Sequence, residues 1–400
     1  MSSWPSRKLA GLPTIALARS TFFLKRNIAH INHGGVGATP RKINDARHRY
    51  QILLEKMGGR FVEDELFPRL RNATIALAKF IGQDGDGLVF MPSATEAIGT
   101  VISNIPVISG RQIIISEFSY PSVKEIVSAK ASVSGAHVFE IKHDFCQGSV
   151  LLERSDVLIN KYRQALEKAT AFVVIDHMCT RTGAVAPLAM LVRLCHERGV
   201  PVLVDGAAAP GAIPIDLKTV VPEFYVGTAY KWLFAPKGSA FLWTAPEWRD
   251  RIRPLIFNKA PDIGFQESFA RMGSCDRAQF LVIPDAIDVW KRLGGETLYN
   301  WNRQMVAAAS EMLSCWWGSR SWSNDTPLGP MNLIELPEYY NGVDRASLQK
   351  KLYYDCGVDT RILSLKGRNW VRISAQIYNT PSDYRKLARC MCVRGQLSRS

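Results

Sequence analysis

Residues 171–207 read AFVVIDHMCTRTGAVAPLAMLVRLCHERGVPVLVDGA, and their pattern decides the fold class. The apolar, β-branched runs at 171–176 and 200–207 are typical of buried strands. Between them, residues 187–199 have helical periodicity, with Pro187 at the start and Gly199 at the end. This order predicts a β-α-β unit, and therefore a parallel sheet whose faces are covered by helices.

The same pattern extends toward the N-terminus. Short apolar runs at 88–90 and 111–116 predict two further strands, and residues 94–105 predict a helix that begins just after the first of them. In open α/β sheets, ligands bind outside the carboxyl ends of the strands. We therefore expect a binding site among the residues that follow these strands, namely Ser93 to Thr95, Phe118, Asp176, His177 and Asp205.

Beyond about residue 255 the spacing of apolar residues changes. A mixed helix and strand region ends in NWVRISAQIYNTPSDYRKL (369–387), which predicts a second, smaller domain. The expected organisation is an N-terminal arm (1–50) that joins the small domain, a large domain (51–255) and a small C-terminal domain (256–400).

Composition and charge argue against several classes of protein. Apolar residues make up 47% of the 400 residues, and no apolar run approaches the roughly 20 residues that span a bilayer. The net charge of +14 comes mostly from dispersed Lys and Arg, which argues against a nucleic-acid partner. The eight cysteines, including the lone pair Cys390 and Cys392, lack paired metal-ligand spacing, so we expect free thiols and no metal.

The first 44 residues contain several basic residues and no acidic one. Such a segment is typical of a short transit peptide. The stretch TFFLKRNIAHINHGG (21–35), however, already has the pattern of an entry into the fold. We therefore expect a cytoplasmic protein, with a short transit peptide as the alternative.

Lys231 stands among apolar and aromatic residues in FYVGTAYKWLFAPKGSAFLW (224–243). Burial disfavours the charged ammonium and lowers the pKa of a lysine, which turns its amine into a nucleophile able to form a Schiff base with an aldehyde. The alternative is a lysine at a strand end whose stem is buried and whose charge reaches water.

Two more features suit an aldehyde cofactor that carries a ring and a phosphate. Asp205 ends a buried strand and has no basic neighbour in sequence. It therefore needs a cationic partner from elsewhere, such as a protonated pyridine nitrogen. The alternative is an aspartate bonded to backbone amides. Ser93 and Thr95 stand at the start of a helix, where free amides and the helix dipole bind anions, although this pattern is also that of an ordinary helix cap.

Taken together, these residues resemble the class V aminotransferase family of pyridoxal phosphate (PLP) enzymes, and its isopenicillin N epimerase-like branch. The resemblance runs from about residue 21 to 390. Its motifs follow one another in the family's order: INHGGVGATP (31–40), RF (60–61), SATEA (93–97), IDHMCTRTGAVAPL (175–188), VDGAAAPGAIPIDL (204–217), YVGTAYKWLFAPKGSAFLW (225–243), GSCD (273–276) and VRISAQIYNTPSDY (371–384).

The resemblance implies the α/β fold called fold type I, in which a mostly parallel, seven-stranded sheet lies between helices and a smaller α+β domain follows. It implies PLP as cofactor, an amino acid as substrate, and a homodimer with the active site at the subunit interface. The catalytic residues implied are Lys231 as the Schiff-base lysine, Asp205 at the ring nitrogen, and Tyr230. The further cofactor-binding residues implied are Ser93, Ala94, Thr95, Phe118 stacked on the ring, Asp176, His177, Thr228, and Ser274 from the neighbouring subunit. The substrate-binding residues implied are Arg372 at the carboxylate, Asn32 and His33.

Departures from the family pattern bear on the reaction. Ala208 and Tyr230 stand where the branch usually has histidines, and Phe118 stands where relatives often stack a histidine. Phenylalanine has no proton to give to the face opposite Lys231, which two-base epimerisation requires. We therefore expect β- or γ-elimination or replacement, such as carbon–sulfur lysis. Epimerisation and transamination are the alternatives; for epimerisation, Tyr120, Tyr230, His33 or water would supply the second proton. A catalytically silent binding protein with the same fold is the alternative of another class.

Overall fold

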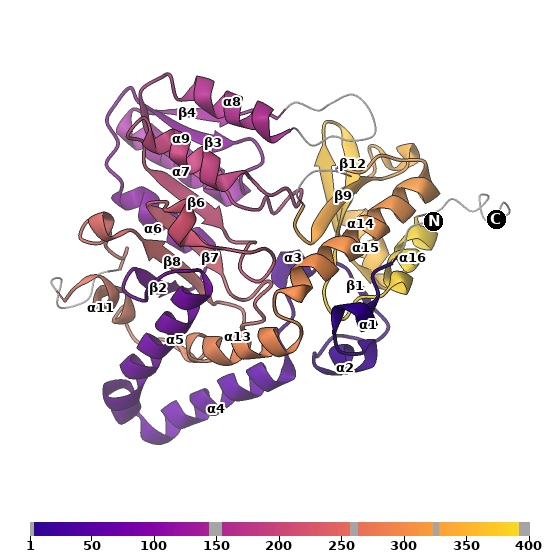
Figure 1. Cartoon of the computed structure of the whole chain (residues 1–400), viewed down its shortest axis with the longest axis horizontal. Coiled ribbons are helices and arrows are strands. Elements are labelled where there is room, and N and C mark those ends of the chain that lie inside the picture. The colour runs from indigo at the N-terminus through magenta and orange to yellow at the C-terminus, as the bar shows by residue number, and fades with distance from the viewer. Residues whose placement is uncertain (1–3, 144–153, 257–262, 323–327, 392–400) are drawn as a thin grey trace.

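The structure is a computed structural model, which describes residues 4–143, 154–256, 263–322 and 328–391. Its largest sheet has seven strands in the order β2-β8-β7-β6-β5-β3-β4 (Figure 1). All neighbouring strands run parallel except β8, which is antiparallel to both β2 and β7. The bounds are β2 Leu88–Met91, β3 Gln112–Ser116, β4 His137–Ile141, β5 Thr170–Asp176, β6 Val202–Gly206, β7 Phe224–Thr228 and β8 Ala240–Thr244. The predicted mostly parallel α/β sheet is therefore confirmed.

Both faces of this sheet are buried, because successive side chains of a strand point to opposite sides. In β5, Phe172 and Val174 pack in one apolar cluster, whereas Val173 and Ile175 pack in another. Helices α6 (Ala94–Asn104) and α7 (Pro121–Ser134) cover the first face, and α5 (Phe67–Phe80), α8 (Ser155–Ala165), α9 (Leu188–His196) and α13 (Ile283–Arg292) contribute to the cluster on the second. The continuous apolar runs of the sequence are explained by this two-sided burial.

A smaller sheet of three antiparallel strands, β11-β12-β9, follows in the C-terminal part of the chain. It consists of β9 Met331–Glu335, β11 Arg361–Leu365 and β12 Arg368–Ser374, with helices α14 (Thr297–Trp317), α15 (Arg345–Tyr354) and α16 (Pro381–Cys390) nearby. Figure 1 shows this group on the opposite side of the molecule from β3 and β4. We retain the division into residues 1–50, 51–255 and 256–400 as a proposal.

The N-terminal segment packs on this C-terminal part. Helices α1 (Arg7–Ala10) and α2 (Ile15–Ser20) are followed by β1 (Ala29–His30), which pairs with β10 (Val358–Asp359). The Arg19 guanidinium donates two 2.9 Å hydrogen bonds to the Asp383 carboxylate in α16, and the Arg7 guanidinium lies 4.6 Å from the centre of the Trp301 ring. Helix α3 (His33–Val36) then brings the chain between the two sheets (Figure 1). Helix α4 (Arg41–Met57) and the π-helical turn η1 (Phe61–Leu66) lead on to α5.

The cysteines differ in part from expectation. Cys356 and Cys390 form a disulfide, with their Cα atoms 6.0 Å apart, so the prediction of free thiols is wrong for these two residues. The pairing joins the end of α15 to the end of α16, two positions that sequence spacing does not relate. Cys179, Cys195, Cys275 and Cys315 are free thiols, and Cys146 and Cys392 lie outside the described residues. Among the described residues, no helix has the length and apolar character needed to cross a membrane.

Candidate active site

A cavity of about 350 Å³ lies at the carboxyl ends of the central strands. The elements that line it come from the large sheet, from the N-terminal segment and from the small sheet, which are far apart in sequence. The predicted site residues that line it are Asn32, Ser93, Ala94, Thr95, Asp205, Tyr230, Lys231 and Arg372. The structure therefore brings most of the predicted site together in one place.

Lys231 lies in the loop that follows β7, and its side chain is buried in the cavity wall. Only 7% of the residue is exposed, and the next three residues, Trp232 to Phe234, have no exposed surface. Burial lowers the pKa of the Lys231 ammonium from 10.5 to about 8; the Asp205 carboxylate opposes this change and the Arg372 guanidinium adds to it. The amine is therefore far easier to deprotonate near neutral pH than that of a lysine in water.

Asp205 belongs to β6, and its carboxylate reaches the cavity. Its Oδ1 accepts a 2.9 Å hydrogen bond from the Ala207 amide, so the interaction that the backbone alternative requires is present. Burial raises the pKa of Asp205, while the Ala207 amide and the Lys231 ammonium lower it. A carboxylate that shares a cavity with the lysine amine suits a cationic ring nitrogen.

Asp176 occupies the register position opposite Asp205 in the neighbouring strand β5, but it does not line this cavity. Its Oδ2 accepts a 2.8 Å hydrogen bond from the Ser119 hydroxyl. Burial, and next the Asp205 carboxylate, raise the pKa of Asp176 to about 7. Two adjacent carboxylates of this kind repel each other, so a proton held by Asp176 favours a charged Asp205.

The start of α6 forms the anion-binding end of the cavity. Ser93 is the N-cap of this 11-residue helix, and its hydroxyl oxygen accepts a 3.1 Å hydrogen bond from the Glu96 amide. Ala94 and Thr95 provide the first turn, where backbone amides and the helix dipole favour an anion. Thr228 does not join them: its hydroxyl is fully buried and donates a 2.6 Å hydrogen bond to the Ala207 carbonyl.

Arg372 is the buried cation at the other end of the cavity. The residue is 5% exposed, its Nη2 donates a 2.8 Å hydrogen bond to the Asn32 side-chain oxygen, and its Nη1 donates to the Thr180 carbonyl. Its buried Nε has no hydrogen-bond partner among the residues that the structure describes. Burial, and next the charge of Arg361, lower the pKa of Arg372 to about 10.

Arg361 is a functional candidate that sequence reasoning missed. It lines the same cavity and pairs with Arg372 in the register of β11 and β12. Nothing in the local pattern around Arg361 marks it; only the pairing of the two strands brings the second guanidinium to the site.

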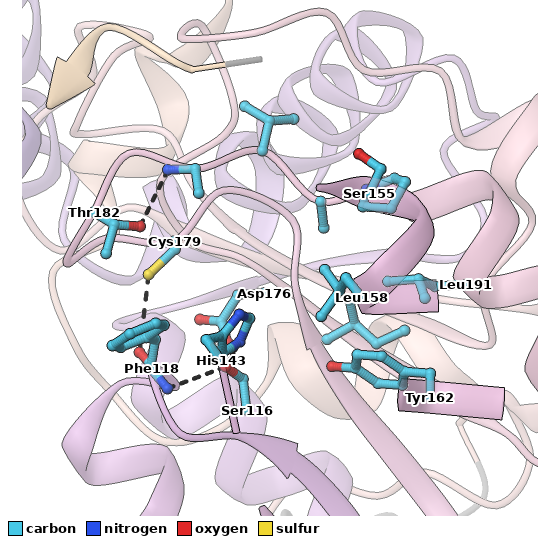
Figure 2. Close-up of a pocket in the computed structure, with 15 residues that line it drawn as sticks. Ser116, Phe118, His143, Ser155, Leu158, Tyr162, Asp176, Cys179, Thr182 and Leu191 are labelled. Atoms are coloured by element: carbon cyan, nitrogen blue, oxygen red, sulfur yellow. Dashed lines mark hydrogen bonds between the residues drawn. The ribbon is translucent and has the colours of Figure 1, made fainter. Parts of the chain in front are cut away.

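Phe118 lies elsewhere. It borders a separate cavity of about 60 Å³ together with Asp176, Tyr162 and Cys179 (Figure 2). It also packs against Trp322. Phe118 stands in a tight turn after β3, in which its amide donates a 3.0 Å hydrogen bond to the Ser116 hydroxyl, and it is not among the residues that line the Lys231 cavity. The structure therefore does not support Phe118 as the residue stacked on the cofactor ring.

Tyr120, two positions later at the start of α7, lines the Lys231 cavity instead. In the sequence, Tyr120 is marked only by its position after a strand, and Phe118 has the same position.

The two predicted histidines do not line the cavity. Nδ1 of His177 lies 2.9 Å from the Tyr225 hydroxyl, and burial lowers the pKa of His177 to about 4. Both ring nitrogens of His33 are hydrogen-bonded to protein groups, so they are not available to a substrate.

Ser274 is exposed and lies beside Asp276, which bonds to Arg47 and Gln51 of α4, away from the cavity of its own chain. Its predicted role in a neighbouring subunit stays a prediction.

The chain is similar in sequence to known proteins. The model of the family described as Aminotransferase class-V matches residues 62–334. The probable L-cysteine desulfhydrase, chloroplastic, of Arabidopsis thaliana is 27% identical over 90% of this chain and 82% of its own length. The isopenicillin N epimerase of Amycolatopsis lactamdurans is 28% identical over 94% of this chain and 97% of its own length.

Two solved structures share the fold. The apo cysteine desulfurase from Thermococcus onnurineus NA1 has a TM-score of 0.80 at 16% identity and covers 98% of both chains. A variant of the protein C-DES with glycine covalently linked to its PLP cofactor has a TM-score of 0.76 at 19% identity, covering 97% of this chain and 99% of the other.

Proposed function

The chain belongs to the class V aminotransferase family and is a PLP-dependent enzyme, and from this premise we propose that it is a lyase. The proposed reaction removes the α-proton of an amino acid and eliminates a β- or γ-substituent, such as a sulfur group. The main observation in support of this proposal is that one cavity is lined by Lys231, Asp205, the start of α6 and Arg372.

The residues present fit this cofactor. The Lys231 amine, which burial makes easier to deprotonate, would hold the aldehyde, and Asp205 would pair with the ring nitrogen. The first turn of α6, with Ser93 and Thr95, would hold the phosphate. Tyr120, in place of Phe118, would cover the ring. When bound, the cofactor supplies an electron sink for the electron pair that remains after the α-proton leaves.

The proposed steps assign a task to each protein group. Arg372 binds the substrate carboxylate through its guanidinium, a geometry suited to two parallel hydrogen bonds. The Lys231 amine takes the α-proton. Tyr230 keeps its phenolic proton, because burial, and next the neighbouring Tyr120, raise its pKa, so it is a donor to a leaving group or to the phosphate.

Epimerisation is the second candidate, and one observation favours it. Tyr120 lines the cavity and carries a phenolic proton, so an acid other than Lys231 is available there. One of the relatives is an isopenicillin N epimerase, while another is a probable cysteine desulfhydrase. Elimination remains our first proposal because it needs one base, and the two histidines expected near the ring do not line the cavity.

The test is incubation of the purified enzyme in deuterated water with L-cysteine and a panel of other amino acids. Repeated release of a keto acid, ammonia and, from cysteine, sulfide supports a lyase. Deuterium at Cα with inversion supports an epimerase, and a single turnover that stops without a keto acid partner supports a transaminase; either outcome overturns elimination. The silent-protein alternative predicts no α-proton exchange with any amino acid.

Lys231→Ala is expected to abolish turnover and the absorbance of the cofactor-lysine linkage. Lys237→Ala is the matched control, because Lys237 lies in the same loop and bonds to the Thr39 hydroxyl, outside the cavity. Equal turnover by the two variants would contradict the assignment of Lys231.

We further propose a homodimer in which Ser274 of one subunit reaches the phosphate of the other, and a cytoplasmic location. Ser274→Ala should then weaken cofactor binding, measured by cofactor dissociation, while the variant stays a dimer like the wild type, measured by size-exclusion chromatography with light scattering. A monomer with full cofactor affinity would contradict the dimer proposal.

A further inference from the structure

The segment 31–37 lies directly against the main chain of the Lys231 loop. Gly37 has a φ of +73°, and a Cβ atom placed on it would lie 2.2 Å from the Tyr230 carbonyl oxygen and 2.5 Å from that of Lys231. A Cβ atom on Gly34 would lie 2.1 Å from the Met331 sulfur. Because only glycine lets two backbones approach so closely, Gly37 allows the segment to contact the main chain of Tyr230 and Lys231, whereas Gly34 makes room for the Met331 side chain.

His33, within this segment, bonds to the lysine itself. Its Nε2 lies 2.7 Å from the Lys231 carbonyl oxygen, and its Nδ1 lies 2.7 Å from the Tyr378 hydroxyl. A carbonyl oxygen only accepts, so Nε2 carries the proton and Nδ1 accepts from the tyrosine. Burial lowers the pKa of His33 to about 3, so the ring is neutral at the pH of catalysis and keeps this tautomer.

The same segment also bonds to the strand that carries Arg372. The His33 amide donates a 2.7 Å hydrogen bond to the Ser374 hydroxyl, and the Ser374 amide donates a 2.8 Å bond to the Ile31 carbonyl. The Asn32 side-chain oxygen accepts a 2.8 Å hydrogen bond from Arg372. Three consecutive residues, 31 to 33, thus link β12 to the Lys231 loop.

We infer that His33 is a positioning residue, which holds the Lys231 main chain at a set place relative to Arg372 and β12. The inference rests on the proposed roles of these two groups: Arg372 binds the carboxylate and Lys231 takes the proton from the adjacent carbon. Since both groups act on neighbouring atoms of one substrate, a shift between them by about 1 Å lowers the rate by about 100-fold. His33 itself touches neither substrate nor cofactor.

The chain offers a matched set of variants. His33→Leu removes both ring hydrogen bonds, whereas His33→Gln keeps an amide N–H at similar reach for the Lys231 carbonyl. Tyr378→Phe removes only the bond that selects the tautomer. Tyr384→Phe is the control, because the fully buried Tyr384 hydroxyl donates a 2.9 Å bond to the Ser374 carbonyl and does not touch the His33 ring.

The first measurement needs no substrate: it is the pH midpoint at which the absorbance of the cofactor linked to Lys231 changes. The second is kcat and KM for α-proton exchange with any amino acid that the wild type accepts. His33→Leu should shift the midpoint and lower kcat by about 100-fold, with a much smaller change in KM, because Arg372 keeps its contacts. Tyr378→Phe should change the pH midpoint and kcat in the same direction as His33→Leu, but by less. His33→Gln should recover most of the kcat that His33→Leu loses.

Tyr384→Phe should lower thermal stability and leave the pH midpoint and kcat as in the wild type. The inference is overturned if Tyr378→Phe and the His33 variants that fold behave like Tyr384→Phe, losing stability only. If His33→Leu does not fold, Tyr378→Phe and His33→Gln decide the question in the same way. Absence of any cofactor band or proton exchange in the wild type would instead refute the proposed function, so the two failures are distinguishable.

Discussion

The lowered pKa of Lys231 leads to a quantitative prediction for the cofactor-free protein. With a pKa of about 8, about 10% of the Lys231 side chains carry a free amine at pH 7, against about 0.03% for a lysine at the ordinary value of 10.5. Lys231 should therefore react with a small acylating reagent about 300-fold more readily at pH 7 than its ordinary pKa would allow, for equal access.

The assay is competitive labelling with acetic anhydride between pH 6 and 11, read by mass spectrometry. The exposed Lys218 is the internal reference. The acetylation of Lys231 should rise with a midpoint near pH 8. Asp205→Asn should move the midpoint lower, because the carboxylate stabilises the ammonium, and Arg372→Gln should move it higher, because the guanidinium destabilises it. A midpoint near 10.5 would refute the idea that burial prepares this amine, and a midpoint that neither variant moves would refute the contribution of the two charges.

Three further predictions concern the rest of the molecule. Gly37→Ala should lower the free energy of unfolding by about 2–4 kcal/mol and impair cofactor binding. Gly11→Ala has a positive φ too, but its added Cβ would meet no atom of the described residues within 4 Å apart from its chain neighbours, so it should cost only about 1 kcal/mol. Equal losses in a denaturant titration would contradict the close approach at Gly37. Arg372→Gln should raise KM for the amino acid by about 10- to 100-fold and leave the cofactor bound, so an unchanged KM would remove it from the carboxylate site. Cys356→Ser should lower the free energy of unfolding by about 4 kcal/mol, because the disulfide closes a loop of 34 residues. An unchanged denaturation midpoint under non-reducing conditions would refute the contribution of this bond.

The part of the site that depends on local pattern was predictable. Asp205 lies near the end of β6, Lys231 follows β7, and the Ser93–Thr95 turn follows β2. The carboxyl ends of such strands meet at one edge of the sheet. The order of strands and helices therefore suffices to bring them near one another. The same pattern could not tell Phe118 from Tyr120, because both follow β3 and the turn between them decides which side chain enters the cavity.

The part that depends on long-range pairing was not predictable in detail. Arg361 reaches the cavity through the register of two strands in the small sheet, and its own neighbours in sequence carry no sign of this. His33 has the residue type of a substrate contact, yet the structure uses both of its nitrogens to bond protein groups. A histidine in a motif indicates that the imidazole is needed, but only the fold decides whether it meets the substrate or the backbone.

The charge of the cavity bears on which ligands it favours. Among the described residues, those that line it include three cationic side chains, Lys231, Arg361 and Arg372, and a single carboxylate, Asp205. Two of these cations, Lys231 and Arg372, are buried, and Arg361 is exposed. Such a cavity favours ligands with more than one negative charge, since a buried cation needs a partner. A cofactor phosphate at the start of α6 and a substrate carboxylate at Arg372 would meet that need, whereas a neutral amine lacking the carboxylate would leave Arg372 unpaired. Discrimination against such amines should thus come from the cost of the unpaired guanidinium, and it should weaken in Arg372→Gln, where that guanidinium is absent.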